Sequence, residues 1–183
     1  MIVASVVIVA AIAWVGFAYV GYPLLLALLA RLSPRPLVRG DVSPSATIVI
    51  AVHNGAHHLQ RKLENTLALT YPRPFEILVA SDGSTDATDE IARSLAHRGV
   101  RLVRNEVRQG KEAAQAAGIG KAGGEVLVFT DLTAELSPDA LRAIVRPFAD
   151  PSVGCVSSED RVDHEGGEGT YVRMEMALRR WES

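Results

Sequence analysis

The chain has 183 residues and a formal net charge of −2. This length allows one ordinary globular domain and one small additional element. A nearly neutral chain offers no basic surface to a phosphate backbone, and its few aromatic residues are not interleaved with Lys or Arg. Nucleic acid is therefore not an expected partner. A single cysteine, Cys155, excludes an intrachain disulfide, and its apolar neighbours predict that it packs in the core within a buried strand.

The first thirty residues differ from the rest because they contain no Asp, Glu, Lys, Arg or His. The apolar run over 2–29 exceeds the roughly 20 residues that a helix needs to cross the hydrocarbon core of a bilayer. We therefore predict a transmembrane helix over 1–30 and an extended, proline-containing linker over 31–45. A cleaved signal peptide and a buried core helix are the alternatives. The first would need a basic start and a cleavage site, and the second a polar face.

Basic residues follow the apolar segment and none precedes it, since the first three are Arg31, Arg35 and Arg39. The positive-inside rule then predicts a single-pass membrane protein, in contact with the lipid bilayer, whose globular part is cytoplasmic. Within the segment, Tyr22–Pro23 is compatible with either a kink or an interfacial turn.

Residues 46–183 alternate between short β-branched runs and helical patterns. The predicted strands cover 46–52, 75–80, 100–103, 126–129 and 153–157, and the predicted helices cover 58–69, 87–97, 111–121, 138–148 and 171–181. Strands that alternate with helices of this length predict βαβ units. The expected class is α/β, with a doubly wound, mostly parallel sheet.

In such a sheet, ligands bind beyond the carboxyl ends of the strands. Polar residues follow the predicted strands at His53–Asn54, Ser81–Asp86, Arg104–Asn105 with Gly110–Lys111, and Thr130–Asp131. The Asp131 carboxylate is able to reach a divalent cation or a ribose hydroxyl, with a helix cap as the alternative. Lys111 begins a helix after a glycine, which favours a diphosphate, with an ordinary surface lysine as the alternative.

Other motifs lack the context that their chemistry needs. The run over 118–123 fits G-x-G-x-x-G, but a strand follows it instead of preceding it, so we interpret it as a helix end and turn. His53, His57 and His58 have no H-E-x-x-H pattern and no cysteine pair to complete a metal site. Neither the G-x-S-x-G motif of hydrolases nor the P-loop motif is present.

The ordered set of remaining motifs resembles family 2 glycosyltransferases, in the membrane-anchored branch that includes cellulose-synthase-like and hyaluronan-synthase-like enzymes. It consists of TIVIAVHN (47–54), LENTL (63–67), ILVASDGSTD (77–86), QGKEAA (109–114) and VLVFTD (126–131). The resemblance implies a Rossmann-like GT-A domain over 46–183 that holds a nucleoside-diphosphate sugar, with a UDP-sugar as the expected donor.

The same resemblance assigns roles to particular residues. His53, Asn54 and Asp82 would lie near the base and ribose, Lys111 toward the nucleotide, and Asp131 toward the ribose and a Mg²⁺ or Mn²⁺ ion. The full implied donor site is His53, Asn54, Asp82, Gly83, Ser84, Lys111 and Asp131. The family's Asp-x-Asp motif reads Asp131-Leu132-Thr133 here, which leaves the strength of cation binding open. After Asn54, the acidic residues that are usual in the family are replaced by Gly55 and Ala56.

The resemblance implies transfer of a sugar, with inversion, to a lipid-linked or polysaccharide acceptor. The family's general base and its Gln-x-x-Arg-Trp motif fall beyond Ser183, so no catalytic residue is assigned, and this chain alone is expected to be inactive. Glu159 and Asp160 are candidate stand-ins for the base, with a surface loop as the alternative. The competing function is a catalytically silent, membrane-tethered module that binds a nucleotide or a partner.

Overall fold

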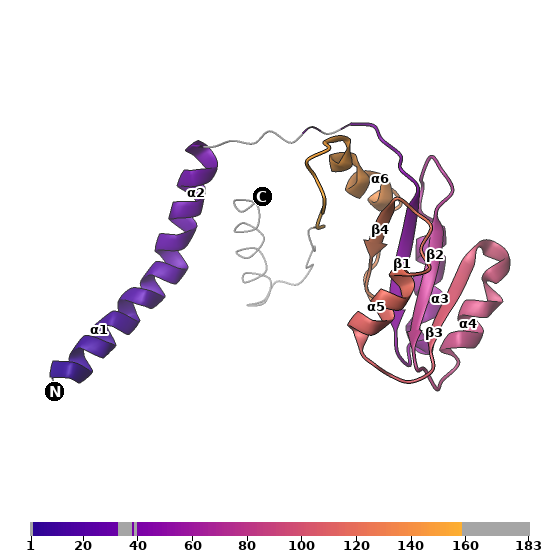
Figure 1. Ribbon diagram of the computed structural model, residues 1–183, viewed down its shortest axis with the longest axis horizontal. Helices are drawn as coiled ribbons and strands as arrows, with labels where there is room; N and C mark the ends of the chain where they lie inside the picture. The colour runs from indigo at the N-terminus through magenta and orange to yellow at the C-terminus, as the bar shows by residue number, and fades with distance from the viewer. Residues whose placement is uncertain (1, 33–37, 39, 159–183) are drawn as a thin grey trace. The chain divides into compact units, whose positions relative to one another are not determined.

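The computed structural model describes residues 2–32, 38 and 40–158. They belong to two units, an N-terminal helix and a globular unit over Val38–Val156 (Figure 1). The predicted helix over 171–181 and the candidate residues Glu159 and Asp160 lie outside the described residues.

The N-terminal helix runs from Ile2 to Leu32, and its length and composition are sufficient to cross a membrane. It consists of α1 (Ile2–Gly16), a π-helical turn (Phe17–Gly21) and α2 (Tyr22–Leu32), and none of its residues is buried. A signal sequence would share these properties.

The π-helical turn lies immediately before Pro23, at the position where the sequence left a kink or an interfacial turn open. The Tyr22 amide donates to the Phe17 carbonyl, five residues earlier. Proline has no amide hydrogen, so the backbone must rearrange locally around it, and single π-turns are a recognised way to do so. The helix therefore continues through Pro23 instead of ending there.

The globular unit contains, among its described residues, four parallel strands in the order β3-β2-β1-β4. The strands are β1 (Ala46–Val52), β2 (Glu76–Asp82), β3 (Val100–Asn105) and β4 (Val126–Phe129). Because the chain adds β2 and β3 on one side of β1 and β4 on the other, the strand order reverses between β1 and β4. This topology confirms the predicted doubly wound sheet, whose ligand crevice lies at such a reversal.

Helices cover both faces of the sheet (Figure 1). They are α3 (Ala56–Leu67), α4 (Thr88–Ser94), α5 (Lys111–Ile119) and α6 (Ala140–Val145), with 3₁₀ turns at Ala96–Arg98 and Arg146–Ala149. One core cluster joins Ile48 and Ile50 of β1 to residues of α3, α4 and α6, whereas Val49 packs in a second cluster with α5. Successive strand residues point to opposite faces, and helices cover both, which explains why β1 is apolar except for Thr47.

Strands β2 and β3 extend beyond their predicted carboxyl ends. The site residue Asp82 therefore lies within a strand instead of in the loop after it. Asp82 and Asn105 pair in the ladder as the last residues of these strands. The glycine-rich run over 118–123 is the end of α5 and the turn before β4, as predicted.

The predicted strand over 153–157 is wrong. Residues 153–158 form neither helix nor strand, and Cys155 is exposed instead of packed in the core. A short β-branched run becomes a strand only if a neighbouring strand pairs with it, and periodicity carries no information about such a partner.

Glu76 connects the amino ends of the strands. Its carboxylate accepts hydrogen bonds from Thr47 Oγ1 (2.9 Å) and the Gly123 amide (3.1 Å), and it pairs with Arg101. Burial would raise the pKa of Glu76, but the hydrogen bonds from Gly123, Thr47 and Arg101 outweigh it and lower that pKa below its ordinary value of 4.5.

We expect the hydrogen bonds and the ion pair of Glu76 to stabilise the fold at pH values above the ordinary pKa of a glutamate. A lowered pKa in the folded state gives a stabilising contribution that is lost as the pH falls through that pKa. Glu76→Gln should therefore reduce the free energy of unfolding at about pH 7 and flatten its decline toward about pH 4. Chemical denaturation at both pH values measures this, with the exposed Glu90→Gln as control. Equal pH dependence in wild type and Glu76→Gln would contradict the assignment.

Candidate functional site

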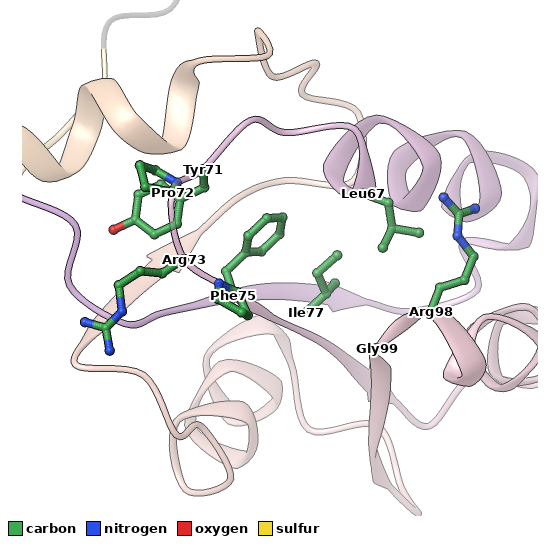
Figure 2. A pocket seen from close by; sticks show the side chains of 9 residues that line it. Leu67, Tyr71, Pro72, Arg73, Phe75, Ile77, Arg98 and Gly99 are labelled. Carbon is green, nitrogen blue, oxygen red and sulfur yellow. The ribbon is translucent and has the colours of Figure 1, made fainter.

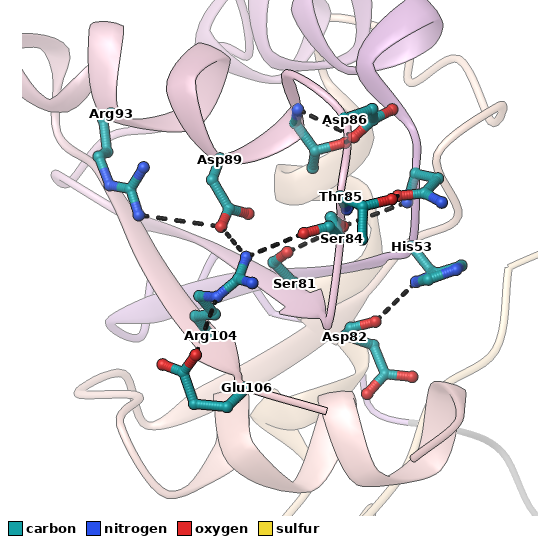
Figure 3. A network of polar contacts seen from close by, with 12 residues as sticks. His53, Ser81, Asp82, Ser84, Thr85, Asp86, Asp89, Arg93, Arg104 and Glu106 are labelled. Atoms are coloured by element: carbon teal, nitrogen blue, oxygen red, sulfur yellow. Dashed lines mark hydrogen bonds and ion pairs between the residues drawn. The ribbon is translucent and has the colours of Figure 1, made fainter. Parts of the chain in front are cut away.

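The polar residues that follow the strands come together at the carboxyl end of the sheet. His53 Nδ1 lies 2.7 Å from the Asp82 carbonyl oxygen, and the Asn54 amide donates to Ser84 Oγ at 3.2 Å (Figure 3). Lys111 Nζ donates to Asp131 Oδ1 at 2.5 Å. Hydrogen bonds therefore connect the end of β1 to the end of β2. An ion pair connects the start of α5 to Asp131, beyond the end of β4.

The loop after β2 also caps α3. Asp86 Oδ2 accepts from the Ala56 amide at 3.1 Å, and Thr88 Oγ1 accepts from the Gly55 amide at 2.9 Å. Asn54 has a φ of 49° and accepts from the Thr85 amide at 2.8 Å. The bonds from the Gly55 and Ala56 amides satisfy donors at the start of α3 that the helix itself leaves free. The loop and α3 are therefore fixed to each other.

Asp82 is a buried carboxylate, with 3 % of its surface exposed. It accepts from the amides of Gln109 (2.9 Å) and Gly110 (2.7 Å) and from Asn105 Nδ2 (3.2 Å). The hydrogen bond from Gln109 and, next to it, those from Gly110 and Asn105 lower the pKa of Asp82 below its ordinary 3.8 despite burial. Asp82 thereby shapes the loop that leads from β3 to Lys111.

Gly83 allows this loop to pass close to β2. Its φ is +62°, and a Cβ at this position would lie 2.6 Å from the Arg108 amide nitrogen. A larger residue would be strained in its own backbone and would displace the loop.

A charged network supports the same loop from the side of α4 (Figure 3). Arg104 pairs with the buried Asp89 and donates to the Ser84 carbonyl at 3.1 Å, and Glu106 lies 3.5 Å from its Nε. The hydrogen bond that Arg104 donates to the Asp89 carboxylate raises the pKa of Arg104 above its ordinary value. The sequence identified Arg104 only as a strand-end residue and gave no sign of its partner Asp89.

Lys111 and Asp131 are the accessible part of the site. Their side chains are 59 % and 65 % exposed, so a ligand is able to reach both. Asp131 is a lone carboxylate in its motif, and residues 2–32, 38 and 40–158 contain no group of three or more His, Cys, Asp or Glu that could hold a metal ion. Mg²⁺ is often held by only one or two carboxylates together with substrate phosphates. The donor set therefore fits a cation that is shared with a bound diphosphate.

Lys62 is a buried lysine that sequence reasoning missed. Its Nζ donates to Thr130 Oγ1 (2.8 Å) and to the Ala134 carbonyl (2.6 Å). Burial lowers its pKa from 10.5 to about 8, although Asp131 and Glu135 oppose this change. A signal was present in the sequence: Lys62 lies three residues after Leu59 and four before Thr66, both buried on the same side of α3.

A pocket of about 430 Å³ lies at the opposite, amino end of the sheet (Figure 2). Its lining comes from the segments before β2 and β3 and from the end of α3: Leu67, Tyr71, Pro72, Arg73, Pro74, Phe75, Ile77, Arg98 and Gly99. None of the predicted site residues lines it. The candidate site is therefore defined by the strand ends and not by this pocket.

Comparison with known proteins places these features in a family. A model of glycosyl transferase family 2 matches residues 47–182. Glycosyltransferase AglE of Haloferax volcanii is 32 % identical over 145 residues, which cover 76 % of this chain and 45 % of that protein. Succinoglycan biosynthesis protein ExoO of Rhizobium meliloti is 31 % identical over 134 residues, covering 73 % and 38 %.

Solved structures give the same result. The mannosyltransferase PcManGT of Pyrobaculum calidifontis, in complex with GDP-Man and Mn²⁺, superposes with a TM-score of 0.67 at 32 % identity, covering 81 % of this chain and 47 % of that one. S. aureus TarS 1–349 superposes with a TM-score of 0.52 at 20 % identity over 55 % of this chain and 32 % of that one, and supports the fold alone. The chain thus spans less than half the length of these proteins.

Proposed function

Because the chain belongs to glycosyl transferase family 2 and has a GT-A-like fold, we propose that its globular unit binds a nucleoside-diphosphate sugar at the carboxyl ends of β1, β2 and β4. The whole protein would transfer this sugar to a lipid-linked or polysaccharide acceptor. The observation that carries the proposal is the contact between Lys111 and Asp131. It brings an accessible ammonium and an accessible carboxylate together beside the reversal in strand order, where such sheets bind ligands.

The proposed roles follow from charge and position. His53, Asn54 and Asp82, with Gly83 and Ser84, would surround the base and ribose. The start of α5 offers free backbone amides and the Lys111 ammonium, both of which favour a diphosphate. On binding, Lys111 would exchange Asp131 for the diphosphate, leaving the Asp131 carboxylate for the ribose or a cation.

The donor class is supported by the similar mannosyltransferase, which was solved with GDP-Man and Mn²⁺. The sequence resemblance predicted a UDP-sugar, so the two nucleotides are the first to compare. The cation, when bound, would neutralise charge that develops on the diphosphate leaving group. Asp131 offers it one carboxylate, and Thr133 stands where the family has the second. Cation binding should therefore require the nucleotide.

Calorimetry on the full chain in detergent tests this function. We expect GDP or UDP to bind, Mn²⁺ alone to bind weakly, and each to strengthen the other, because Asp131 and the diphosphate together complete the cation's ligands. Lys111→Ala should weaken nucleotide binding about tenfold or more, since it removes a charge-assisted contact to phosphate. Lys121→Ala removes the same charge beyond the opposite end of α5 and should leave the affinity nearly unchanged.

Two results would contradict the proposal. One is the absence of nucleotide binding with and without Mn²⁺. The other is an equal loss of affinity in Lys111→Ala and Lys121→Ala, which would indicate a general charge effect instead of a site at the start of α5.

The apolar helix Ile2–Leu32 supports a further part of the proposal, that the protein is anchored in a membrane by one span with the globular unit in the cytoplasm. Arg31, Arg35 and Arg39 after the helix favour this orientation, which suits a donor made in the cytosol. Thr133 favours a second candidate, a membrane-tethered module that binds the nucleotide without transferring a sugar. A radiolabelled nucleotide-sugar assay on the whole protein, with membrane lipid extract, separates the two, because transfer is expected only of the enzyme.

A further inference from the structure

Lys62 has no role in the proposed function, yet it is buried and its ammonium contacts Thr130, the residue before Asp131. Only 3 % of its surface is exposed. Its two acceptors, Thr130 Oγ1 and the Ala134 carbonyl, lie directly before and directly after the segment Asp131–Leu132–Thr133. The Ala134 amide also donates to the Asp131 carbonyl at 3.3 Å, which closes a turn. One ammonium thus connects both ends of the turn that carries Asp131.

Gly55, which precedes α3, and Asn65 within α3 contact the segment over 132–136. Leu132 packs so closely over Gly55 that a Cβ there would lie 2.6 Å from Leu132 Cδ2. One turn after Lys62 on α3, Asn65 exchanges two hydrogen bonds of 2.9 Å with the main chain of Leu136. Helix α3 therefore fixes this segment at several points, but Lys62 contacts the two ends of the Asp131 turn.

Stability alone does not explain an ammonium at this position. Both acceptors of Lys62 are neutral oxygens, and among residues 40–158 no carboxylate forms an ion pair with it. Burying a charge without a partner of opposite charge is unfavourable, and well-packed apolar residues often replace buried charges without loss of stability. Its distinctive contribution is geometric, because a single side chain donates to both ends of the turn.

We propose that Lys62 is a positioning residue that holds the Asp131 turn in the orientation needed to share a divalent cation with the donor diphosphate. This inference rests on the proposed function, in which Asp131 is the cation ligand. Residues that orient a metal ligand through hydrogen bonds typically change metal affinity about 10- to 100-fold when they are replaced.

Geometry and charge make opposite predictions for Lys62. As a positive charge near Asp131, Lys62 opposes a cation, so its removal would strengthen cation binding if charge were its main effect. As a positioning residue, it supports cation binding, and its removal would weaken it. The sign of the change therefore distinguishes the two roles.

The experiment measures Mn²⁺ affinity by electron paramagnetic resonance of free Mn²⁺, on the full chain in detergent with saturating GDP or UDP. We expect Lys62→Met to lower this affinity about 10- to 100-fold. Lys62→Gln, which keeps a donor, should lower it less. Asn65→Ala loosens the neighbouring segment without touching the turn and should leave the affinity nearly unchanged. Nucleotide affinity without Mn²⁺ should be similar in all four proteins.

Unchanged or tighter Mn²⁺ binding in Lys62→Met and Lys62→Gln would overturn the proposal, and so would an equal loss in Asn65→Ala. If the wild type binds neither nucleotide, the proposed function fails, and amide hydrogen exchange then tests Lys62 separately. Exchange at Ala134 should be faster in Lys62→Met than in the wild type, and equal exchange would refute the positioning role. If Lys62→Met does not fold, Lys62→Gln is used for both measurements.

Discussion

Asp82→Ala should weaken nucleotide binding about 10- to 100-fold, the range expected when several partly buried donors lose their acceptor. The amides of Gln109 and Gly110 and the side chain of Asn105 all donate to this carboxylate. Without it, these donors would be left without a partner, and the loop that carries Lys111 would lose its shape. The mutation would therefore damage the diphosphate end of the site together with the base and ribose end. Calorimetry with GDP and UDP measures the effect.

Asp82→Asn is the matched control because it keeps one acceptor oxygen in the same place. Its affinity should lie between those of the wild type and Asp82→Ala. Hydrogen exchange at Gln109 and Gly110 should increase in the same order. Wild-type affinity in Asp82→Ala would remove this residue from the site and would also show that the β3–α5 loop does not need it.

Removal of residues 1–37 should transfer the protein from the membrane fraction to the soluble fraction. The helix Ile2–Leu32 exposes almost all of its apolar side chains, and none of them is buried within the described protein. Exposing such a helix to water is strongly unfavourable, whereas the hydrocarbon of a bilayer accommodates it. Fractionation after carbonate extraction provides the measurement. The shortened protein should retain nucleotide binding, since the globular unit has its own core.

Orientation requires a separate measurement on the full chain. Protease added to sealed right-side-out vesicles should leave residues 46–183 intact, because the arginines after the helix predict a cytoplasmic globular unit. Digestion of this region from outside would reverse the proposed topology. A shortened protein that stays in the carbonate-extracted membrane would show that another part of the chain binds lipid.

Much of the fold was predictable because its signals are local. The strands over 46–52 and 126–129 begin and end where the sequence placed them, and their apolar runs followed by polar residues indicated buried parallel strands. The strand over 153–157 failed because pairing requires a neighbour that no local pattern reveals. Exposure of Cys155 follows from the same missing partner.

The candidate site was likewise predictable from the sequence only in part. Composition and periodicity were enough to identify the apolar helix, the parallel strands and the polar residues at their ends, because these features depend on residues close together in sequence. Only the tertiary structure decided which polar groups are already occupied. Asp82 is bound by amides 27 and 28 residues away, and Lys62 reaches residues 68 and 72 positions further on. Such contacts depend on how helices pack on the sheet, so only the folded chain distinguishes the accessible pair Lys111–Asp131 from the buried groups that hold it in place.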